Sequence, residues 1–280
     1  MVAPINSIPA RTSCAALAIE SVLGESTVTS VFASNPLKLL TPRSRGTSVW
    51  SYLSSYGGGF VAGDQTRLDL SLGPNTRCFF GTQASTKIYR NAGLRPCGHE
   101  TKATIAGNSM LVFAPDPVSA YAGSTYTQRQ AFRLASGAGL ALVDWLSSGR
   151  AARGERWAFN RFSSRNEVFI NDKRVFLDSL SLGATDDLAG SPHRLGRFNC
   201  LGLLLLVGEP LRTAAVALLA DLAARPVDRR GPLISSASPM GDGAILRVAG
   251  EQVEDVGREL HRHLIFARGL LGDDPWARKW

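Results

Sequence analysis

The stretch YGGGFVAGDQTRLDLSLGPNTRCFFGTQASTKIYR, from Tyr56 to Arg90, decides the fold of this chain. Three consecutive glycines open it, and an alternating run follows whose apolar positions are Leu68, Leu70 and Leu72. Alternation with a period of two is typical of a strand with one buried face. A Gly-Pro-Asn turn at residues 73–75 then leads into a second apolar run. The stretch therefore predicts a glycine loop, a strand, a turn and a second strand.

Glycine-rich loops also occur in nucleotide-binding sites. A dinucleotide fingerprint or a P-loop requires a helix whose N-terminus follows the glycines and faces the phosphates. Here the residues after Gly63 and Asp64 alternate like a strand. The pattern argues against nucleotide binding.

Composition places the chain among globular proteins. It has 280 residues, of which 44% are hydrophobic and 19% charged. We expect no membrane span, since no run reaches the ~18 apolar residues that one needs, and no secretory signal, since the first residues lack a sustained apolar core. The net charge of +8 is compatible with nucleic acid or with acidic protein partners.

The four cysteines are scattered and form no C-x-x-C pair. This pattern favours buried reduced thiols and a cytoplasmic location. Their positions are Cys14, Cys78, Cys97 and Cys200.

Strand patterns fill most of the chain before residue 207. Turn residues predict three hairpins: Ala15–Val22 with Thr27–Phe32, His99–Ala106 with Ser109–Phe113 around Gly107-Asn108, and Glu167–Ile170 with Arg174–Leu180. The nearly wholly apolar run Phe198–Val207 predicts a strand covered on both faces.

Helical patterns come only near the C-terminus. They cover Leu211–Ala224 and Gln252–Leu271, with a loop at Arg225–Gly243 and a strand at Ala244–Val248 between them. Strands first and helices last argue against a βαβ fold. We therefore expect one mainly β domain, 1–280, of layered antiparallel sheets, with a β-rich part at 1–207 and a helical C-terminal portion at 208–280.

Several ordered motifs together resemble one protein family. They are GGGFVAGD at 57–64, LDLSLGP at 68–74, TQASTKIYR at 82–90, Pro115-Asp116-Pro117, Tyr126 with Gln128, and the segment from Asp144 to Ile170. This set is similar to the urease accessory protein UreD family, called UreH in some organisms. One departure is Ala62, where a glycine is usual.

The resemblance implies an elongated, β-helix-like architecture with two helices. It also implies a non-enzymatic, cytoplasmic maturation factor that binds apo-urease and UreF, and UreG through UreF, without nucleic acid or membrane. Ni²⁺ would pass transiently through a water-filled tunnel, with no tightly bound cofactor. Borderline metals accept oxygen and water ligands, so carboxylates and hydroxyls suffice for such passage. The acids and hydroxyls within the matched motifs are the expected tunnel residues: Asp64, Asp144, Glu167, Thr82, Ser85 and Thr86.

Asp144 lies in the apolar run ALVDWL, where an acid must be hydrated or paired. An ion pair with Arg150 or Arg153 is the structural alternative to a tunnel role. The remaining residues of the central motif are expected to shape it: Gly57, Gly58, Gly59, Gly63, Gln83, Lys87 and Tyr89.

Two further features predict partner contacts. The arginines at 150, 153, 156, 161 and 165 lie among aromatic residues, which could stack nucleic-acid bases, but interspersed acids favour a solvated or partner-facing edge. Helix 211–224 has few charges, so it is either buried in its own core or docked on another subunit. The partner-binding candidates are Arg150, Arg153, Leu218 and Leu222.

Metal and catalytic motifs are weak. The histidines, His99, His193, His261 and His263, form no H-x-x-x-H pair, and Cys97-Gly98-His99 is at most one ligand pair in a turn. No G-x-S-x-G or H-E-x-x-H motif occurs, which argues against an enzyme. The alternatives are a β-rich binding module for an acidic protein or nucleic acid and, after that, a hydrolase.

Overall fold

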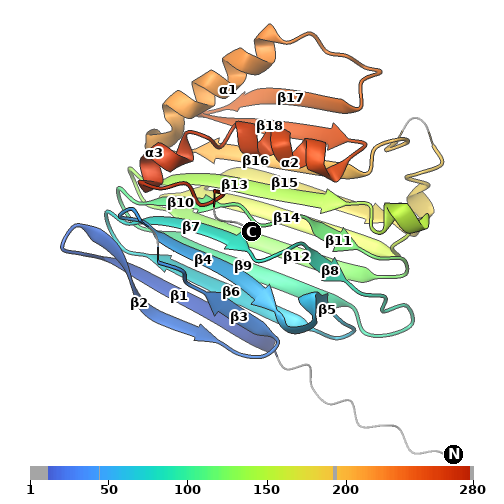
Figure 1. The fold of residues 1–280 in the computed structure, drawn as a ribbon, viewed down its shortest axis with the longest axis horizontal. Coiled ribbons are helices and arrows are strands. Elements are labelled where there is room, and N and C mark those ends of the chain that lie inside the picture. Colours follow the sequence, from blue (N-terminus) through green and yellow to red (C-terminus); the bar gives the residue numbers. More distant parts are fainter. Residues whose placement is uncertain (1–11, 44, 192–193, 278–280) are drawn as a thin grey trace, which may run out of the picture.

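The computed structural model describes residues 12–43, 45–191 and 194–277. Two sheets face each other, and helices cover the outer side of one of them (Figure 1). The seven-stranded sheet has the order β15 (Lys173–Gly183), β14 (Arg161–Ile170), β12 (Thr125–Leu134), β9 (Cys97–Ile105), β6 (Gln65–Leu72), β1 (Thr12–Val22) and β2 (Glu25–Ala33).

The second sheet has eleven strands. Its main path is β17 (Leu233–Met240), β18 (Gly243–Gly250), β16 (Cys200–Val207), β13 (Gly139–Ser147), β10 (Met110–Phe113), β7 (Arg77–Thr82), β4 (Val49–Ser55) and β3 (Leu37–Leu40). A side branch joins β5 (Gly59–Phe60), β8 (Thr86–Ile88) and β11 (Val118–Ala120).

The chain coils between the two sheets. It runs from β6 to β7, from β9 to β10 and from β12 to β13, each time from the seven-stranded sheet to the other. Successive turns pair in parallel, as β6 does with β9 and β9 with β12. The result is a β-solenoid-like arrangement of about four turns, which confirms the mainly β, β-helix-like fold. The sheets are therefore mixed, and not antiparallel throughout as expected: antiparallel pairing is confined to the two ends, for example β3–β4 and β16–β18.

Two of the three expected hairpins are confirmed, β1–β2 and β14–β15. The hairpin around Gly107-Asn108 is wrong. Asn108 has a positive φ, as in a tight turn, but the turn carries the chain across to the other sheet rather than back along its own. The Gly107-Asn108 pair does form a turn, but the strands on either side of it, β9 and β10, pair with strands of neighbouring coils and not with each other.

The C-terminal part differs from expectation in two places. The predicted helix Gln252–Leu271 is divided into α2 (Val253–Arg262) and α3 (Ala267–Leu271) by a turn in which the Leu264 N–H bonds to the His261 carbonyl. The predicted loop Arg225–Gly243 contains β17, an edge strand that tolerates Pro239 because its outer side has no strand partner. The helix α1 (Arg212–Ala224) and the strand β18 are as expected.

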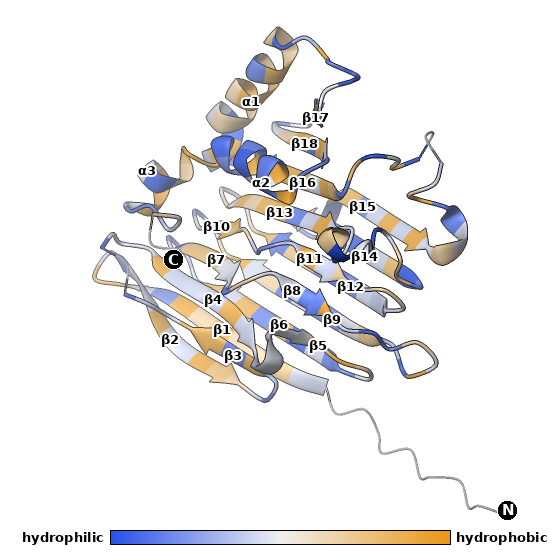
Figure 2. Cartoon of the chain, turned by 45° about the vertical axis from the view of Figure 1, so that its right-hand side comes forward, coloured by the Kyte–Doolittle hydropathy of each residue, from blue (hydrophilic) through white to orange (hydrophobic). Residues whose placement is uncertain are grey.

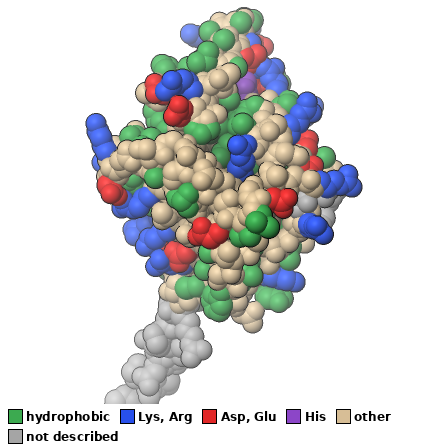
Figure 3. Space-filling view, turned by 90° about the vertical axis from the view of Figure 1, so that its left-hand side faces the viewer, with side chains coloured by type: hydrophobic (Ala, Val, Ile, Leu, Met, Phe, Trp, Pro, Cys, Tyr) green, Lys and Arg blue, Asp and Glu red, His purple; other side chains and the backbone are tan. Residues whose placement is uncertain are grey.

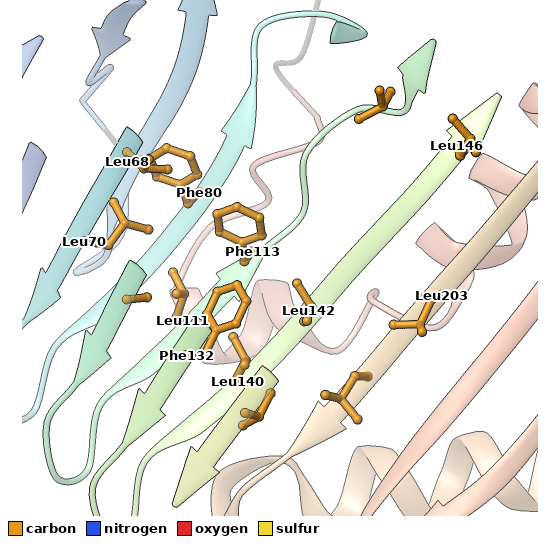
Figure 4. Close-up of a cluster of buried hydrophobic side chains, with 14 of the residues drawn as sticks. Leu68, Leu70, Phe80, Leu111, Phe113, Phe132, Leu140, Leu142, Leu146 and Leu203 are labelled. Atoms are coloured by element: carbon orange, nitrogen blue, oxygen red, sulfur yellow. The ribbon is translucent and has the colours of Figure 1, made fainter. Parts of the chain in front are cut away.

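Alternating polar and apolar positions along the strands, visible as bands in Figure 2, produce two apolar layers. One lies between the sheets, where Phe113 of β10 and Phe132 of β12 meet with ring centroids 5.3 Å apart (Figure 4). The other lies between the eleven-stranded sheet and the helices and contains Leu204, Leu218 and Leu260. β16 is therefore covered on both faces, as its apolar sequence predicts. Among the described residues, no helix is both long and apolar enough to cross a membrane.

Candidate functional site

The glycine loop docks against the strand that ends its own motif. Gly57 and Gly58 have φ values of 79° and 68°, which side chains adopt at a cost. Gly59 pairs with Lys87 in the β5–β8 ladder, so closely that a Cβ at Gly59 would lie 2.1 Å from the Lys87 carbonyl oxygen. The Tyr89 hydroxyl donates to the Gly57 carbonyl at 2.8 Å. These motif residues hold the loop in place.

Gly63 and Asp64 close the same loop. Gly63 has a φ of +84°, and the Asp64 carboxylate accepts the Val61 N–H at 2.8 Å. This hydrogen bond gives Asp64 a local structural role. Asp64 is not among the residues that line the cavities described next.

The first cavity opens beside the loop and holds about 180 Å³. We call it the loop cavity. Gly58, Gln83, Ser85, Thr82 and Thr86 are among its lining residues. Gln83 accepts a hydrogen bond from the Ser54 hydroxyl at 2.7 Å. Three of the expected tunnel residues and two of the expected motif residues thus meet at this opening.

A second cavity, here called the inner cavity, lies between the sheets and holds about 40 Å³. It shares Thr82 and Thr86 with the loop cavity and is also lined by His99, Asp116 and Gln128. The Thr82 hydroxyl donates to the Asp116 carboxylate at 3.0 Å. The volume has room for roughly one to three water molecules.

Parallel register explains why polar groups collect in this apolar interior. Adjacent coils place Thr66, His99, Gln128 and Ser164 side by side across four strands. Each sits at an inward position of its strand, so together they form a polar row through the layer. Such rows arise only when the same face position is polar in several coils.

Asp144 lies at the far end of this row. Its carboxylate accepts hydrogen bonds from Gln128 at 3.0 Å, Ser164 at 2.9 Å and Asn166 at 2.7 Å. Burial raises its pKa, and the three hydrogen bonds oppose that shift. The alternative that Asp144 pairs with Arg150 or Arg153 is wrong, because its hydrogen-bond partners are these three neutral side chains and Arg150 bonds to Glu155.

The third cavity, the seam pocket, holds about 340 Å³ and shares Asp144 with the inner cavity. Ser164, Asp178, Leu203 and Arg247 are among its other lining residues. The loop cavity therefore lies next to the inner cavity, and the inner cavity lies next to the seam pocket. Their lining residues extend from the glycine loop to the seam between β15 and β18.

His99 is the one histidine on the described part of the chain that lines these cavities. Its Nδ1 lies 2.8 Å from the Thr66 hydroxyl and its Nε2 lies 3.1 Å from the Thr101 hydroxyl. Burial lowers its pKa to about 4. The ring is therefore a neutral imidazole at neutral pH, a form able to bind a borderline metal.

The lowered pKa predicts a pH effect on stability. As pH falls from 6.5 toward 4, an unfolded chain protonates this imidazole while the folded chain does not, so the folded state loses up to about 3 kcal/mol relative to the unfolded state. Above pH 6.5 the effect vanishes. Chemical unfolding of wild type and His99→Gln between pH 4 and 7 checks this: stability should fall less steeply with acid in the variant. Parallel curves would contradict it.

Glu167 lies away from the cavities. It is next to Asn166 in β14, so it faces the outer side of the sheet, where it pairs with Arg165 and Arg174 at 3.0 Å each. The expected tunnel role of Glu167, like that of Asp64, does not fit this placement. The presence of both acids in the matched motifs did not reveal which face of its element each acid occupies.

The arginine group does not form a base-stacking surface. Trp157, Phe159 and Phe162 are buried between the sheets. Arg150 is bound to Glu155 and lies over the Tyr121 ring at 4.6 Å, whereas Arg153 is exposed. Figure 3 shows the opposite end of the molecule from this group, and there too basic and acidic side chains are interspersed.

Helix α1 buries one of its two proposed partner residues. Leu218 is 2% exposed and packs in the layer beneath the helices, so it is not available to a partner. Leu222 is half-buried. The exposed side of α1 carries Val216, which is 61% exposed, with Ala217 and Ala220. An exposed apolar side therefore exists, but with different residues from those expected.

Strong metal ligation is not indicated. Within the described residues no group of three or more His, Cys, Asp or Glu side chains is arranged to hold a metal ion. Cys97 lies beside Asn91 and Thr125, and burial raises its thiol pKa to about 12. The four cysteines are free thiols. His193 lies outside the described residues.

Comparison with known proteins gives this geometry a context. The family model described as UreD urease accessory protein matches residues 11–280. The chain belongs to the UreD family of urease accessory proteins. Urease accessory protein UreD of Sorangium cellulosum is 44% identical over 94% of this chain and 83% of its own length. The UreD of an Anaeromyxobacter species is 37% identical over 98% of this chain and 92% of its own length. Urease accessory protein D of Arabidopsis thaliana is 31% identical over 92% of this chain and 98% of its own length.

Several residues of the polar row, and two residues beside it, were not among the tunnel residues expected from the sequence of this UreD-family chain. They are Thr66, His99, Asp116, Gln128, Ser164 and Asn166. A signal was present for some: Gln128 and Gln130 sit at alternate positions of a strand whose other inward residues are apolar. Polar residues at inward positions mark a lined cavity or a buried network.

Proposed function

We propose that this chain is a urease maturation factor that binds apo-urease and the UreF–UreG complex, with UreG held through UreF, and offers Ni²⁺ a route through the solenoid. The observation that supports this route is the row of three adjoining cavities. Thr82 and Thr86 line both the loop cavity and the inner cavity, and Asp144 lines both the inner cavity and the seam pocket.

The ligands along this route suit transit rather than storage. They are hydroxyls, amides, one neutral imidazole and the carboxylates of Asp116, Asp144 and Asp178, spread along the path. Such dispersed donors bind a borderline divalent ion weakly at each point, so that it can leave again. Nickel is thus a passing cargo, and the chain needs no tightly bound cofactor.

The narrow inner cavity sets a condition on transit. With about 40 Å³ it cannot accept an ion with a complete water shell, so side chains must replace part of that shell. Asp116, His99 and Asp144 are spaced along the walls to do so. Entry is therefore expected to depend on these groups and on small movements of the strands.

Maturation of this kind requires no reaction by the chain itself. The buried imidazole of His99 lies between two threonine hydroxyls, and Asp144 is held by three neutral donors. We infer a scaffold that acts in the cytoplasm, in keeping with its free thiols.

The exposed side of α1 is the proposed UreF contact. Val216→Asp introduces a charge at a position that would be dehydrated on docking, so UreF recovery with the tagged chain should fall about tenfold. Leu94→Asp is the matched control, because Leu94 is 66% exposed on a different loop. Quantified co-purification with UreF and urease from cells expressing the urease operon checks this.

Two outcomes would count against the proposal. Equal recovery of UreF with both variants would show that α1 is not part of the interface with UreF. Failure of the wild-type chain to recover urease or UreF at all would reject the scaffold function.

A further inference from the structure

The seam pocket exists because the two sheets differ in extent. The seven-stranded sheet ends at β15, whereas the other continues through β16, β18 and β17. The inward faces of β18 and β17, which lie beyond β16, are therefore only partly covered. The Arg247 guanidinium donates to the Asp178 carboxylate at 3.0 Å and ties the two sheets together at this seam.

Most of the pocket wall is apolar. Phe162 and Leu180 contribute from one sheet, and Leu201, Leu203 and Ile234 from the other. Asp144 and Ser164 supply polar atoms at the boundary with the inner cavity. A volume of about 340 Å³ with apolar walls and few polar groups is typical of a small-molecule site.

Asp144 retains the capacity for one more hydrogen bond. An ionised carboxylate accepts about four. Asn166 and Ser164 occupy one oxygen, Oδ2, but Gln128 alone occupies Oδ1. Since Asp144 lines the seam pocket, a donor there could supply the fourth hydrogen bond.

The charged residues of the seam pocket indicate which kind of hydrogen-bond donor it would bind. Two carboxylates, Asp144 and Asp178, and one guanidinium, Arg247, line the pocket, which leaves a net negative site. Arg247 is already paired, so an anion would meet no free cation there. The leucine walls offer an inorganic cation no ligands, so a hydrated metal ion would cross the pocket without being held there.

We propose that the seam pocket binds a small organic ammonium ion, whose apolar body lies against the leucines and whose N–H group donates to the Asp144 carboxylate. Burial disfavours the charged form of this carboxylate, and a cation beside it offsets that cost. If the nickel route proposed above exists, an occupant here closes it at Asp144; this consequence rests on the proposed function, whereas the binding itself does not.

The test uses the purified full-length chain with benzylammonium and with benzyl alcohol, a neutral compound of similar shape, in calorimetric titrations. Wild type should bind benzylammonium at least about tenfold more tightly, the worth of a hydrogen bond to a charged group. Asp144→Asn should bind the two equally. Glu167→Gln, which alters an acid on the outer face, should keep the wild-type preference.

Amide NMR shifts locate the site independently of any substitution. Benzylammonium should shift resonances of β15, β16 and β18. Ala249→Trp, which fills the pocket from a half-buried position, should abolish binding of both compounds. Absence of binding to wild type, equal affinity for the two compounds, or shifts confined to other strands would overturn the proposal.

Discussion

Replacing Asp144 with asparagine is expected to lower urease activation about tenfold or more, the loss typical of altering a polar group around a metal. The substitution removes the negative charge at the boundary between inner cavity and seam pocket. It also places an amide N–H₂ toward Gln128 or toward Ser164 and Asn166, all of which donate to the present carboxylate. An ion arriving from the inner cavity would lose both its counter-charge and its ligand.

The measurement is urease activity and nickel content in cells whose only copy of this chain carries the substitution. Unfolding of the purified variant must be followed as well, since unpaired buried donors cost about 1–3 kcal/mol. Glu167→Gln is the matched control, because it removes a charge of the same sign from the outer face of the neighbouring sheet. Full activation by a folded Asp144→Asn chain would show that nickel does not pass this residue.

Gly59→Ala should have the largest effect on stability, a loss of about 3 kcal/mol, at the upper end of overpacking penalties. The new Cβ would lie 2.1 Å from the Lys87 carbonyl oxygen and 2.8 Å from its carbon. Those are backbone atoms of the β5–β8 ladder, so no side-chain rotation can relieve the contact. The glycine loop and the wall of the loop cavity would separate.

Gly57→Ala separates this contact from ordinary backbone strain. Gly57 has a positive φ of 79° but no atom within 4 Å of an added Cβ, so its cost should be about 1–2 kcal/mol. Urea unfolding of both variants gives the comparison. Equal losses would mean that the close approach of Gly59 to Lys87 contributes nothing of its own.

The sequence predicted those parts of the fold that depend on local patterns. Alternation identified β6 and both terminal hairpins, and the apolar run of β16 correctly indicated cover on two faces. The partner of each strand was harder to predict. The turn at Gly107-Asn108 has the same local chemistry whether the next strand returns to its own sheet or enters the other. Periodicity reports burial and not which coil lies alongside.

The candidate site shows the same division. Thr82, Ser85, Thr86 and Asp144 were expected and do line adjoining cavities. Asp64 and Glu167 were expected for their charge, but a one-residue offset in β14 turns Glu167 outward while Asn166 points in. His99 and Asp116 come close only through the stacking of successive coils. That stacking is a long-range property that spacing along the chain does not reveal.

The most direct test of the account is the nickel content of urease purified from cells that lack this chain but keep the other accessory proteins. The account predicts urease with little nickel and little activity, both restored by wild type and by Glu167→Gln but not by Asp144→Asn. Fully nickel-loaded, active urease from the deletion strain at limiting nickel would contradict it.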